Sequence, residues 1–404
     1  MYRSAAAGWF RCYDNSVIKR RWGACLLSAF ACAALGFGWQ ALTVHYNYQG
    51  DWTALFVTGE KFPPPPALAS ENPRVFPGEG YDGQMYHYVA HDPLLRHDVG
   101  RYMDNARLRY RRILLPALAF LLAGGRQSGI DASFIACNLL FLFLGAWWLG
   151  RYLELAGRNP AWAILFVLVP AALTSLDRLT IDLSLASLCL GVAYYARIDA
   201  PRRLYVVLAL ACLSRETGIV LAIAYCASEL ARHRLARAAI YATSTVPAAL
   251  WYGYVAAKTE PIPLHWPQLI PMAGILGSFA HPVPYPFSPA VNAVIVAIDL
   301  LALAGILMAC VLAFAALSRN RLGLMEIAAV LWALGAIMLP QILWQDCCSS
   351  GRVLTPILMF VALRAVDGAS LIWIVPLLLV SMRTWLQLLS PLFGILKGVL
   401  HRAS

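Results

Sequence analysis

The chain has 404 residues, of which 60% are hydrophobic and 13% are charged, and its mean hydropathy is +0.63. A soluble domain averages about 25% charged residues, so this composition excludes an ordinary soluble domain. The formal net charge of +11 at pH 7 would suit nucleic-acid binding, but the basic residues lie in short loops between apolar runs, as orientation signals do, and we expect no nucleic-acid partner.

The apolar runs predict an all-α polytopic membrane protein surrounded by the lipid bilayer. Several runs exceed the ~18 residues that indicate a transmembrane helix, and they are continuous rather than alternating as in a β-barrel. The first span is expected over residues 22–44, after Lys19-Arg20-Arg21, so the N-terminus is expected in the cytoplasm. We treat residues 1–404 as a single integral membrane domain.

A long hydrophilic loop, residues 45–112, follows the first span and is predicted to be extracytoplasmic. It holds eight of the 21 acidic residues: Asp51, Glu60, Glu71, Glu79, Asp82, Asp92, Asp98 and Asp104. An otherwise apolar chain that concentrates its acids in one loop is expected to use some of them. The loop is therefore the predicted location of the active site.

The apolar segment 113–125 decides the topology of everything after it. At about 1.5 Å per residue it covers roughly 20 Å, less than a ~30 Å hydrocarbon core. If it does not span, the short loops with Arg151, Arg197 and Arg232 all face the cytoplasm, in agreement with the positive-inside rule; if it spans, they face outward. We therefore expect it to lie at the outer surface.

Under that topology the chain makes ten or eleven crossings, counting a broken hairpin as two short ones. The later spans are expected over 131–150, 160–176, 179–196, 204–214 with 218–230, 238–257, 290–317, 323–344, 353–366 and 369–387. Their outer ends carry charged residues on the same side as the first loop: Asp177-Arg178, Asp182, Arg215-Glu216, Asp346 and Arg352. Charged residues at membrane depth are costly and usually face a cavity or a partner, so one site is expected at this end.

Acids and arginines at one membrane face suit the transfer of a group from a lipid phosphate. Arginines hold a phosphate with bidentate geometry and stabilise charge that develops on it as it leaves. An ionised carboxylate in the same cavity can accept a proton from an attacking hydroxyl.

Two stretches of the first loop carry motifs, Tyr81-Asp82-Gly83-Gln84-x-Tyr86 and Tyr110-Arg111-Arg112-Ile113-Leu114-Leu115-Pro116. They resemble the first-loop signature of GT-C-type membrane glycosyltransferases, most closely a bacterial family associated with cell-surface glycopolymer formation and more faintly the GPI second-mannose transferases. Ser214-Arg215-Glu216-Thr217-Gly218 and the segment from Asp177 to Asp182 resemble the bacterial family as well. The resemblance covers most of the chain by layout.

This resemblance implies a GT-C-like fold, a polyprenyl-phosphate-linked sugar donor and a glycan acceptor on the outer face of a bacterial inner (plasma) membrane. Asp82 becomes the candidate catalytic base, and Tyr81, Gln84 and Tyr86 become candidate substrate-binding residues. The loop contains no Asp-x-Asp motif, so we expect no metal and no other cofactor.

The acids each have a structural alternative. Asp82 lies in Tyr-Asp-Gly, an ordinary turn signal. Asp51 follows the first span, where many GT-C enzymes have their acid, but it can instead cap a helix that starts at Trp52. Asp92, before a proline, suits a helix boundary as well as substrate binding.

The basic residues have alternatives too. Arg111, Arg112 and Arg352 begin apolar segments and can be interfacial anchors rather than phosphate ligands. Arg215 and Glu216 can neutralise each other, and Asp177, Arg178 and Asp182 can form a helix-end network. His87, His91 and His97 allow two ligands on one helical face, but the sequence offers no clear third ligand for a metal.

The leading functional hypothesis is an inverting GT-C-type glycosyltransferase, with Asp82 as base and with Arg215 holding the lipid phosphate together with Arg111, Arg112 or Arg352. The first alternative is a transporter or flippase for a lipid-linked glycan, although transporters often contain internal repeats and no second copy of the loop motif occurs. The second is a non-catalytic subunit of a polysaccharide assembly machine.

Overall fold

The computed structural model describes residues 15–68, 71–261, 270–318, 322–345 and 347–403, and it is 78% helical. The first ten α-helices are α1 (Asn15–Asn47), α2 (Asp82–His91), α3 (Ala106–Arg111), α4 (Leu114–Leu122), α5 (Ile130–Leu155), α6 (Pro170–Arg178), α7 (Asp182–Arg197), α8 (Pro201–Ser214), α9 (Ile219–Ala231) and α10 (Leu235–Ala242). The others are α11 (Val246–Lys258), α12 (Ala273–Ala280), α13 (Pro289–Ser318), α14 (Leu324–Ala336), α15 (Gln341–Gln345), α16 (Cys347–Val353), α17 (Thr355–Val366), α18 (Val375–Trp385) and α19 (Leu389–Ala403). The two strands, β1 (Thr58–Gly59) and β2 (Val75–Phe76), pair in parallel in the first loop.

The predicted all-α class is confirmed, and several helices are long and apolar enough to cross a membrane. Within the described residues these are 22–47, 127–155, 289–318 and 371–400. A fifth candidate is the bent pair formed by η5 (Pro160–Leu168) and α6, whose axes differ by 55°. The bend falls at Pro170, whose ring cannot continue a straight helix from the preceding turn. These helices support an integral membrane protein, while the full count of ten or eleven crossings stays a prediction.

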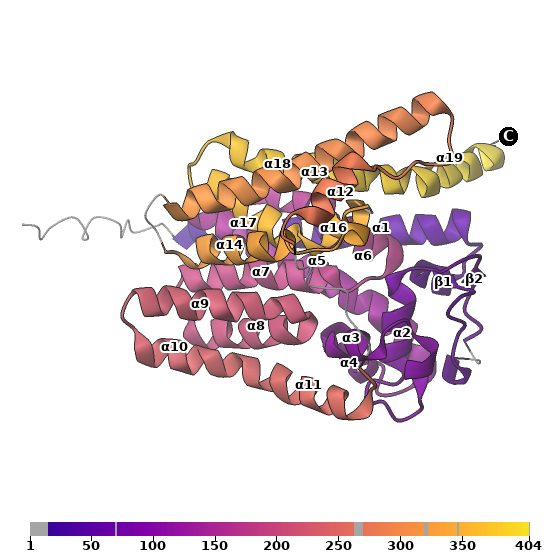
Figure 1. The fold of residues 1–404 in the computed structure, drawn as a ribbon, viewed down its shortest axis with the longest axis horizontal. Helices are drawn as coiled ribbons and strands as arrows, with labels where there is room; N and C mark the ends of the chain where they lie inside the picture. Colours follow the sequence, from indigo (N-terminus) through magenta and orange to yellow (C-terminus); the bar gives the residue numbers. More distant parts are fainter. Residues whose placement is uncertain (1–14, 69–70, 262–269, 319–321, 346, 404) are drawn as a thin grey trace, which may run out of the picture.

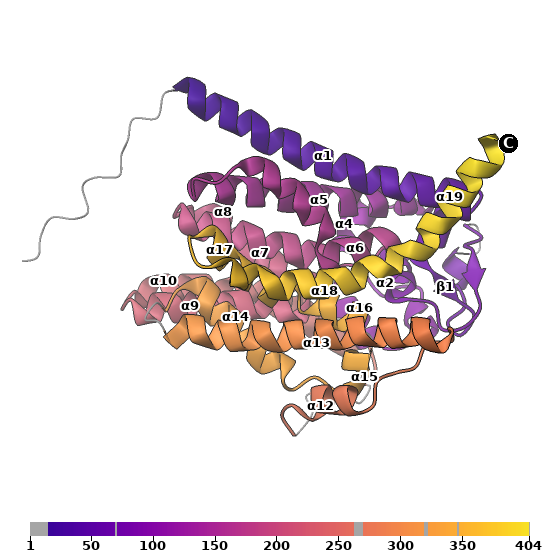
Figure 2. The same ribbon diagram turned by 90° about the horizontal axis from the view of Figure 1, so that it is seen from above.

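The helices run mostly along one axis, so the bundle has two distinct ends (Figures 1 and 2). The first loop, with α2, α3 and both strands, forms one end, and the turn between α9 and α10 lies at the other (Figure 1). Arg197 pairs with Asp367 at 2.5 Å, and Arg237 pairs with Asp199 at 2.6 Å. The loops predicted to be cytoplasmic are therefore joined to one another at the end opposite the first loop.

The segment 113–125 contains α4, a helix of nine residues. At 1.5 Å per residue this helix is about 14 Å long, half of a ~30 Å hydrocarbon core. It cannot cross a bilayer alone, which agrees with the expectation that it lies at the surface.

The first loop has a small hydrophobic core of its own. Its largest buried members include Tyr88 from α2 and Tyr110 from α3, packed with Met85, Val99 and Ile113. Two aromatic side chains of α11 attach this core to the bundle. The indole Nε1 of Trp251 donates to the carbonyl oxygen of Tyr110 at 2.7 Å, and the Tyr254 hydroxyl donates to that of Leu94 at 2.6 Å.

Gly83 lets α2 approach the carboxyl end of α6. A Cβ at this position would collide with the carbonyl oxygen of Arg178 and would lie 3.0 Å from that of Phe56.

Since backbone atoms must move to relieve this overlap, Gly83→Ala is expected to lower the free energy of unfolding by about 1–3 kcal/mol, a typical cost of overpacking. Thermal unfolding of the detergent-purified protein measures the effect. Gly253→Ala is the control, because nothing lies within 4 Å of its Cβ position; equal unfolding temperatures for the two variants would contradict the prediction.

Candidate active site: a buried arginine–carboxylate cluster

Asp82 begins α2, where the positive end of the helix dipole favours a carboxylate. Its Oδ1 accepts a hydrogen bond from Arg109 Nη2 at 2.8 Å, and its Oδ2 accepts one from Arg352. The Asp82 side chain is 23% exposed, whereas both arginines are buried. Asp82 is therefore a partly exposed carboxylate held by two buried arginines.

Arg109 joins this network although the sequence had not singled it out. It makes a bidentate contact with Asp104, at 2.9 and 2.6 Å, and its Nη1 donates to the Tyr86 hydroxyl at 3.3 Å. The spacing of the arginines could have indicated this role. Residues three apart on a helix share a face, and Arg109 lies three residues before Arg112.

Arg112 links the first loop to η6 (Glu216–Gly218), which separates α8 from α9. Its Nε and Nη2 donate to the two carboxylate oxygens of Glu216 at 2.8 and 2.6 Å. Its Nη1 donates to the Tyr86 hydroxyl at 2.7 Å. The hydroxyl of Tyr86 thus accepts from Arg109 and Arg112 together.

Arg352 closes the network from the C-terminal part of the chain. Its Nη1 donates to Asp182 Oδ2 at 3.1 Å, in addition to its contact with Asp82. Arg215 pairs with the other oxygen of Asp182. Asp182 is only 3% exposed, and both of its carboxylate oxygens are paired with a guanidinium group.

We call this group the arginine cluster: Arg109, Arg112, Arg215 and Arg352 with Asp82, Asp104, Asp182, Glu216 and Tyr86. It joins α2, α3, α7, η6 and α16, including residues 270 positions apart. Four guanidinium groups face four carboxylates, so the cluster is close to electrically neutral. Of the residues predicted for the site, the structure brings together Asp82, Tyr86, Arg112, Asp182, Arg215, Glu216 and Arg352.

Two guanidinium groups of the arginine cluster retain unused hydrogen-bond donors. The Nε atoms of Arg215 and Arg352 are buried and make no hydrogen bond within the described residues, although Arg215 Nε lies 3.8 Å from Glu216. A buried donor without an acceptor costs free energy, and a phosphate oxygen is an acceptor that suits a guanidinium.

The arginines also set the basicity of Asp82. Burial alone would raise the pKa of the Asp82 carboxyl, but the positive charges and hydrogen bonds of Arg109 and Arg352 hold that pKa well below its usual range. Asp82 is consequently ionised and, while both arginines hold it, a weak proton acceptor.

Tyr81 and Arg178 border the arginine cluster rather than complete it. The guanidinium carbons of Arg178 and Arg352 lie 4.4 and 5.0 Å from the centre of the Tyr81 ring. Asp177 lies 3.5 Å from Arg178 Nε and accepts a hydrogen bond from Gln387 at 2.8 Å, in keeping with a helix-end network. Asp346 lies outside the described residues.

Within the described residues, the side chains of Gln84, Asp92 and Arg111 make no hydrogen bond or ion pair with the arginine cluster, and they serve local structure. Gln84 bridges the backbone of Gly59 and Glu79. Asp92 accepts hydrogen bonds from the backbone N–H groups of Arg96 and His97 at 2.8 and 2.9 Å, which makes it the helix-boundary residue of the alternative interpretation. The Arg111 guanidinium lies 5.6 Å from the centre of the Tyr252 ring.

Asp51 caps η1 (Trp52–Phe56), as its second interpretation predicted. Its Oδ1 accepts from the backbone N–H and the hydroxyl of Thr53 at 2.9 and 2.7 Å. We expect Asp51→Ala to cost about 0.5–2 kcal/mol of stability through loss of the cap and to leave turnover intact. Asp51→Asn keeps a capping oxygen and is the control for stability. Loss of activity in a folded Asp51→Asn protein would instead favour Asp51 as the base.

A second group of polar side chains lies on the other part of α2. His87 and His91 converge with Asp131 of α5, and all three ligand atoms lie within 4.8 Å of one another. The structure thus supplies the third ligand that the sequence did not reveal, while His97 is exposed and belongs to neither group.

A cavity of about 580 Å³ lies at the opposite end of the bundle. It is lined by charged residues at the ends of helices, including Arg197 of α7, Glu326 of α14, Arg364 of α17 and Asp367, which follows α17. These four form two ion pairs, Arg197–Asp367 at 2.5 Å and Arg364–Glu326 at 2.7 Å. We consider the arginine cluster the better candidate because four buried arginines from separate parts of the chain converge there, whereas Arg197 and Arg364 of the cavity are 33% and 29% exposed and form separate ion pairs.

Comparison with known proteins does not show which family this chain belongs to. No family model, no curated protein and no solved structure matches this chain.

Proposed function

We propose that the protein is an inverting GT-C-type membrane glycosyltransferase. It transfers a sugar from a polyprenyl-phosphate-linked donor to a cell-surface glycan acceptor at the extracytoplasmic face. The observation that carries this proposal is the arginine cluster, in which the partly exposed carboxylate of Asp82 is held by Arg109 and by Arg352, and the Nε atoms of Arg352 and the nearby Arg215 are buried donors without an acceptor among the described residues.

The lipid phosphate occupies the side of the arginine cluster formed by Arg215 and Arg352. Their Nε atoms are the donors without acceptors, and a phosphate oxygen between them gains charge-assisted hydrogen bonds. The same contacts strengthen as the phosphate gains charge during departure, which is the condition for transition-state stabilisation.

Donor binding also activates Asp82. The negative charge of a phosphate bound at Arg352 Nε offsets the positive charge of this arginine, so the pKa of Asp82 rises toward its ordinary value. The base thus becomes effective only once the donor is bound, which limits unproductive proton transfer in the free protein.

The reaction is a single displacement. An acceptor hydroxyl oxygen attacks the anomeric carbon, the bond from that carbon to the phosphate oxygen breaks, and the polyprenyl phosphate leaves with the bonding electron pair. The hydroxyl proton passes to Asp82. Attack from the face opposite the leaving group inverts the anomeric centre.

The proposed setting is a bacterial inner membrane with the N-terminus in the cytoplasm and the arginine cluster facing the periplasm. The collection of basic loops at the opposite end of the bundle supports this orientation by the positive-inside rule. Ten or eleven crossings would include the shorter helices together with the long ones.

Release of the lipid carrier tests the proposal. The purified full-length chain in lipid nanodiscs is incubated with labelled polyprenyl-phosphate sugars and with glycan extracted from cells that lack the protein. A glycosyltransferase produces equimolar free polyprenyl phosphate and elongated glycan. A flippase reconstituted in vesicles moves the intact lipid-linked sugar across the bilayer and releases no carrier, and a non-catalytic subunit does neither.

A further inference from the structure

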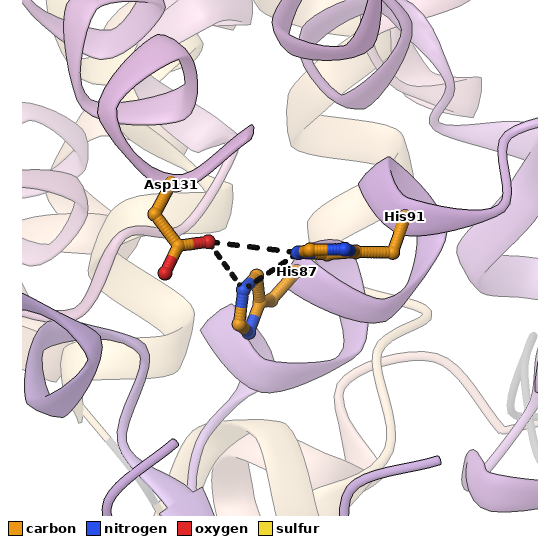
Figure 3. Close-up of side chains that lie close together, drawn as sticks. All are labelled: His87, His91 and Asp131. Carbon is orange, nitrogen blue, oxygen red and sulfur yellow. Dashed lines mark hydrogen bonds and ion pairs between the residues drawn. The ribbon is translucent and has the colours of Figure 1, made fainter. Parts of the chain in front are cut away.

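The second polar group of α2 has the geometry of a metal-binding site. His87 Nε2 lies 2.6 Å from Asp131 Oδ1, His91 Nε2 lies 3.6 Å from the same oxygen, and the two Nε2 atoms lie 3.1 Å apart (Figure 3). Ligands held about 2.0–2.1 Å from a tetrahedral Zn²⁺ lie about 3.4 Å from one another. The three atoms already form a triangle of nearly this size.

The sequence spacing explains how one helix provides two of these atoms. His87 and His91 are four residues apart, so they lie on one face of α2, as the two histidines of helical zinc motifs do. Asp131 comes from the first turn of α5, which packs against α2. The ring of Phe56 stacks on His87 with centroids 3.8 Å apart and fixes the orientation of that imidazole.

Hydrogen bonding shows that His91 presents a lone pair to this triangle. Gln127 Nε2 donates to the carbonyl oxygen of His91 at 3.3 Å, which orients the amide so that its Oε1 faces His91 Nδ1 at 2.5 Å. A neutral His91 therefore carries its proton on Nδ1, and its Nε2 is an acceptor. Metal-binding histidines typically show this arrangement, with the second ring nitrogen donating to a neighbouring oxygen.

Protons alone satisfy this arrangement poorly. A neutral His87 that shares one Nε2 proton between Asp131 and His91 has an acceptor at Nδ1, and that atom is buried without a hydrogen-bond partner within the described residues. The two acceptors, Asp131 Oδ1 and His91 Nε2, then compete for a single proton. A cation at the centre of the triangle would satisfy all three ligand atoms at once.

We propose that His87, His91 and Asp131 bind a divalent transition-metal ion, with Zn²⁺ as the best match to two imidazoles and a carboxylate. Both histidines are buried, whereas the Asp131 side chain is 16% exposed, so the ion enters from the side of Asp131 and retains one open coordination position. The ion joins α2 to the start of α5. It fixes the helix whose first residue is Asp82, without being part of the arginine cluster.

Metal content and metal affinity test this site directly, without any assay of sugar transfer. The full-length chain is purified in detergent with an affinity tag that contains no histidine, stripped with chelator and titrated with Zn²⁺. We expect about one Zn²⁺ per chain and a higher thermal unfolding temperature in its presence. His91→Ala and Asp131→Asn should lose both effects, and Gln127→Ala should weaken binding about 10–100-fold through its contact with His91. His97→Ala is the matched control and should bind as the unmodified chain does.

If the ligand variants do not fold, Co²⁺ titration of the unmodified chain decides the question, because tetrahedral Co²⁺ with nitrogen and oxygen ligands absorbs visible light. Absorption bands that Zn²⁺ removes at one equivalent, and that weaken in Gln127→Ala, support the site. An unmodified chain that retains no metal after dialysis, or equal affinities in all folded variants, overturns it. If the chain binds no metal but still transfers sugar, this site is ruled out and the proposed function still stands.

Discussion

Asp82→Asn is expected to lower kcat for sugar transfer by about 10²–10⁴-fold, the usual contribution of a positioned general base. The asparagine has the same size and retains an acceptor for Arg109 or Arg352, but it cannot take up the proton of the acceptor hydroxyl. Complementation of a strain that lacks the protein measures the effect in cells, through the surface glycan profile and the membrane level of the chain. Release of polyprenyl phosphate measures it in vitro.

The matched control is Asp98→Asn, which removes an acid from the same loop. Its side chain is 61% exposed and, within the described part of the chain, forms an ion pair only with the exposed Arg101, so turnover should not change. Full activity of a folded Asp82→Asn protein would remove Asp82 from the chemistry and shift attention to Asp51 and to the non-catalytic alternatives.

Arg352→Met is expected to have the largest effect on stability, about 3–5 kcal/mol, because it removes one partner from buried ion pairs. Asp182 has 3% exposure and would keep only Arg215, while Asp82 would keep only Arg109. Lower membrane yield and a lower thermal unfolding temperature are the measurements. Arg352→Lys preserves the charge but not the planar fork that reaches two carboxylates, so it should recover part of the stability and little of the turnover.

Arg101→Met is the comparison for Arg352→Met. The Arg101 side chain is 81% exposed, and its ion pair with Asp98 is of the surface kind that contributes about 0–1 kcal/mol. Equal unfolding temperatures for Arg352→Met and Arg101→Met would show that the arginine cluster is not the stabilising network described above.

The meeting of Asp82 with Arg112, Asp182, Arg215, Glu216 and Arg352 could be anticipated from the sequence because helix direction alone assigns each to one end of the bundle. A charged side chain at the end of an apolar helix is costly to leave in lipid, so charged side chains at the same depth are expected to pair. Arg109 and Asp104 could not be anticipated in the same way. Their contribution depends on the short helix α3 and on the packing of Tyr110 in the loop's own core.

The histidine group was missed for a related reason. The spacing of His87 and His91 is visible in the sequence, but the third ligand comes from Asp131, 44 residues after His87. These residues lie close together in space only because α2 packs against α5. Asp51 and Asp92, by contrast, accept hydrogen bonds from backbone N–H groups only two to five residues away. Such local capping roles can be predicted from the sequence.

The attachment of the first loop to α11 gives the protein a mechanical connection between its two faces. Helices α10 and α11 are joined by a single turn. At one end, Arg237 of α10 pairs with Asp199. At the other end, Trp251 of α11 donates a hydrogen bond to the backbone of Tyr110, which lies between Arg109 and Arg111. The segment that carries Arg109 and Arg111 is therefore connected by α10 and α11 to the loop that contains Asp199, at the opposite end of the bundle.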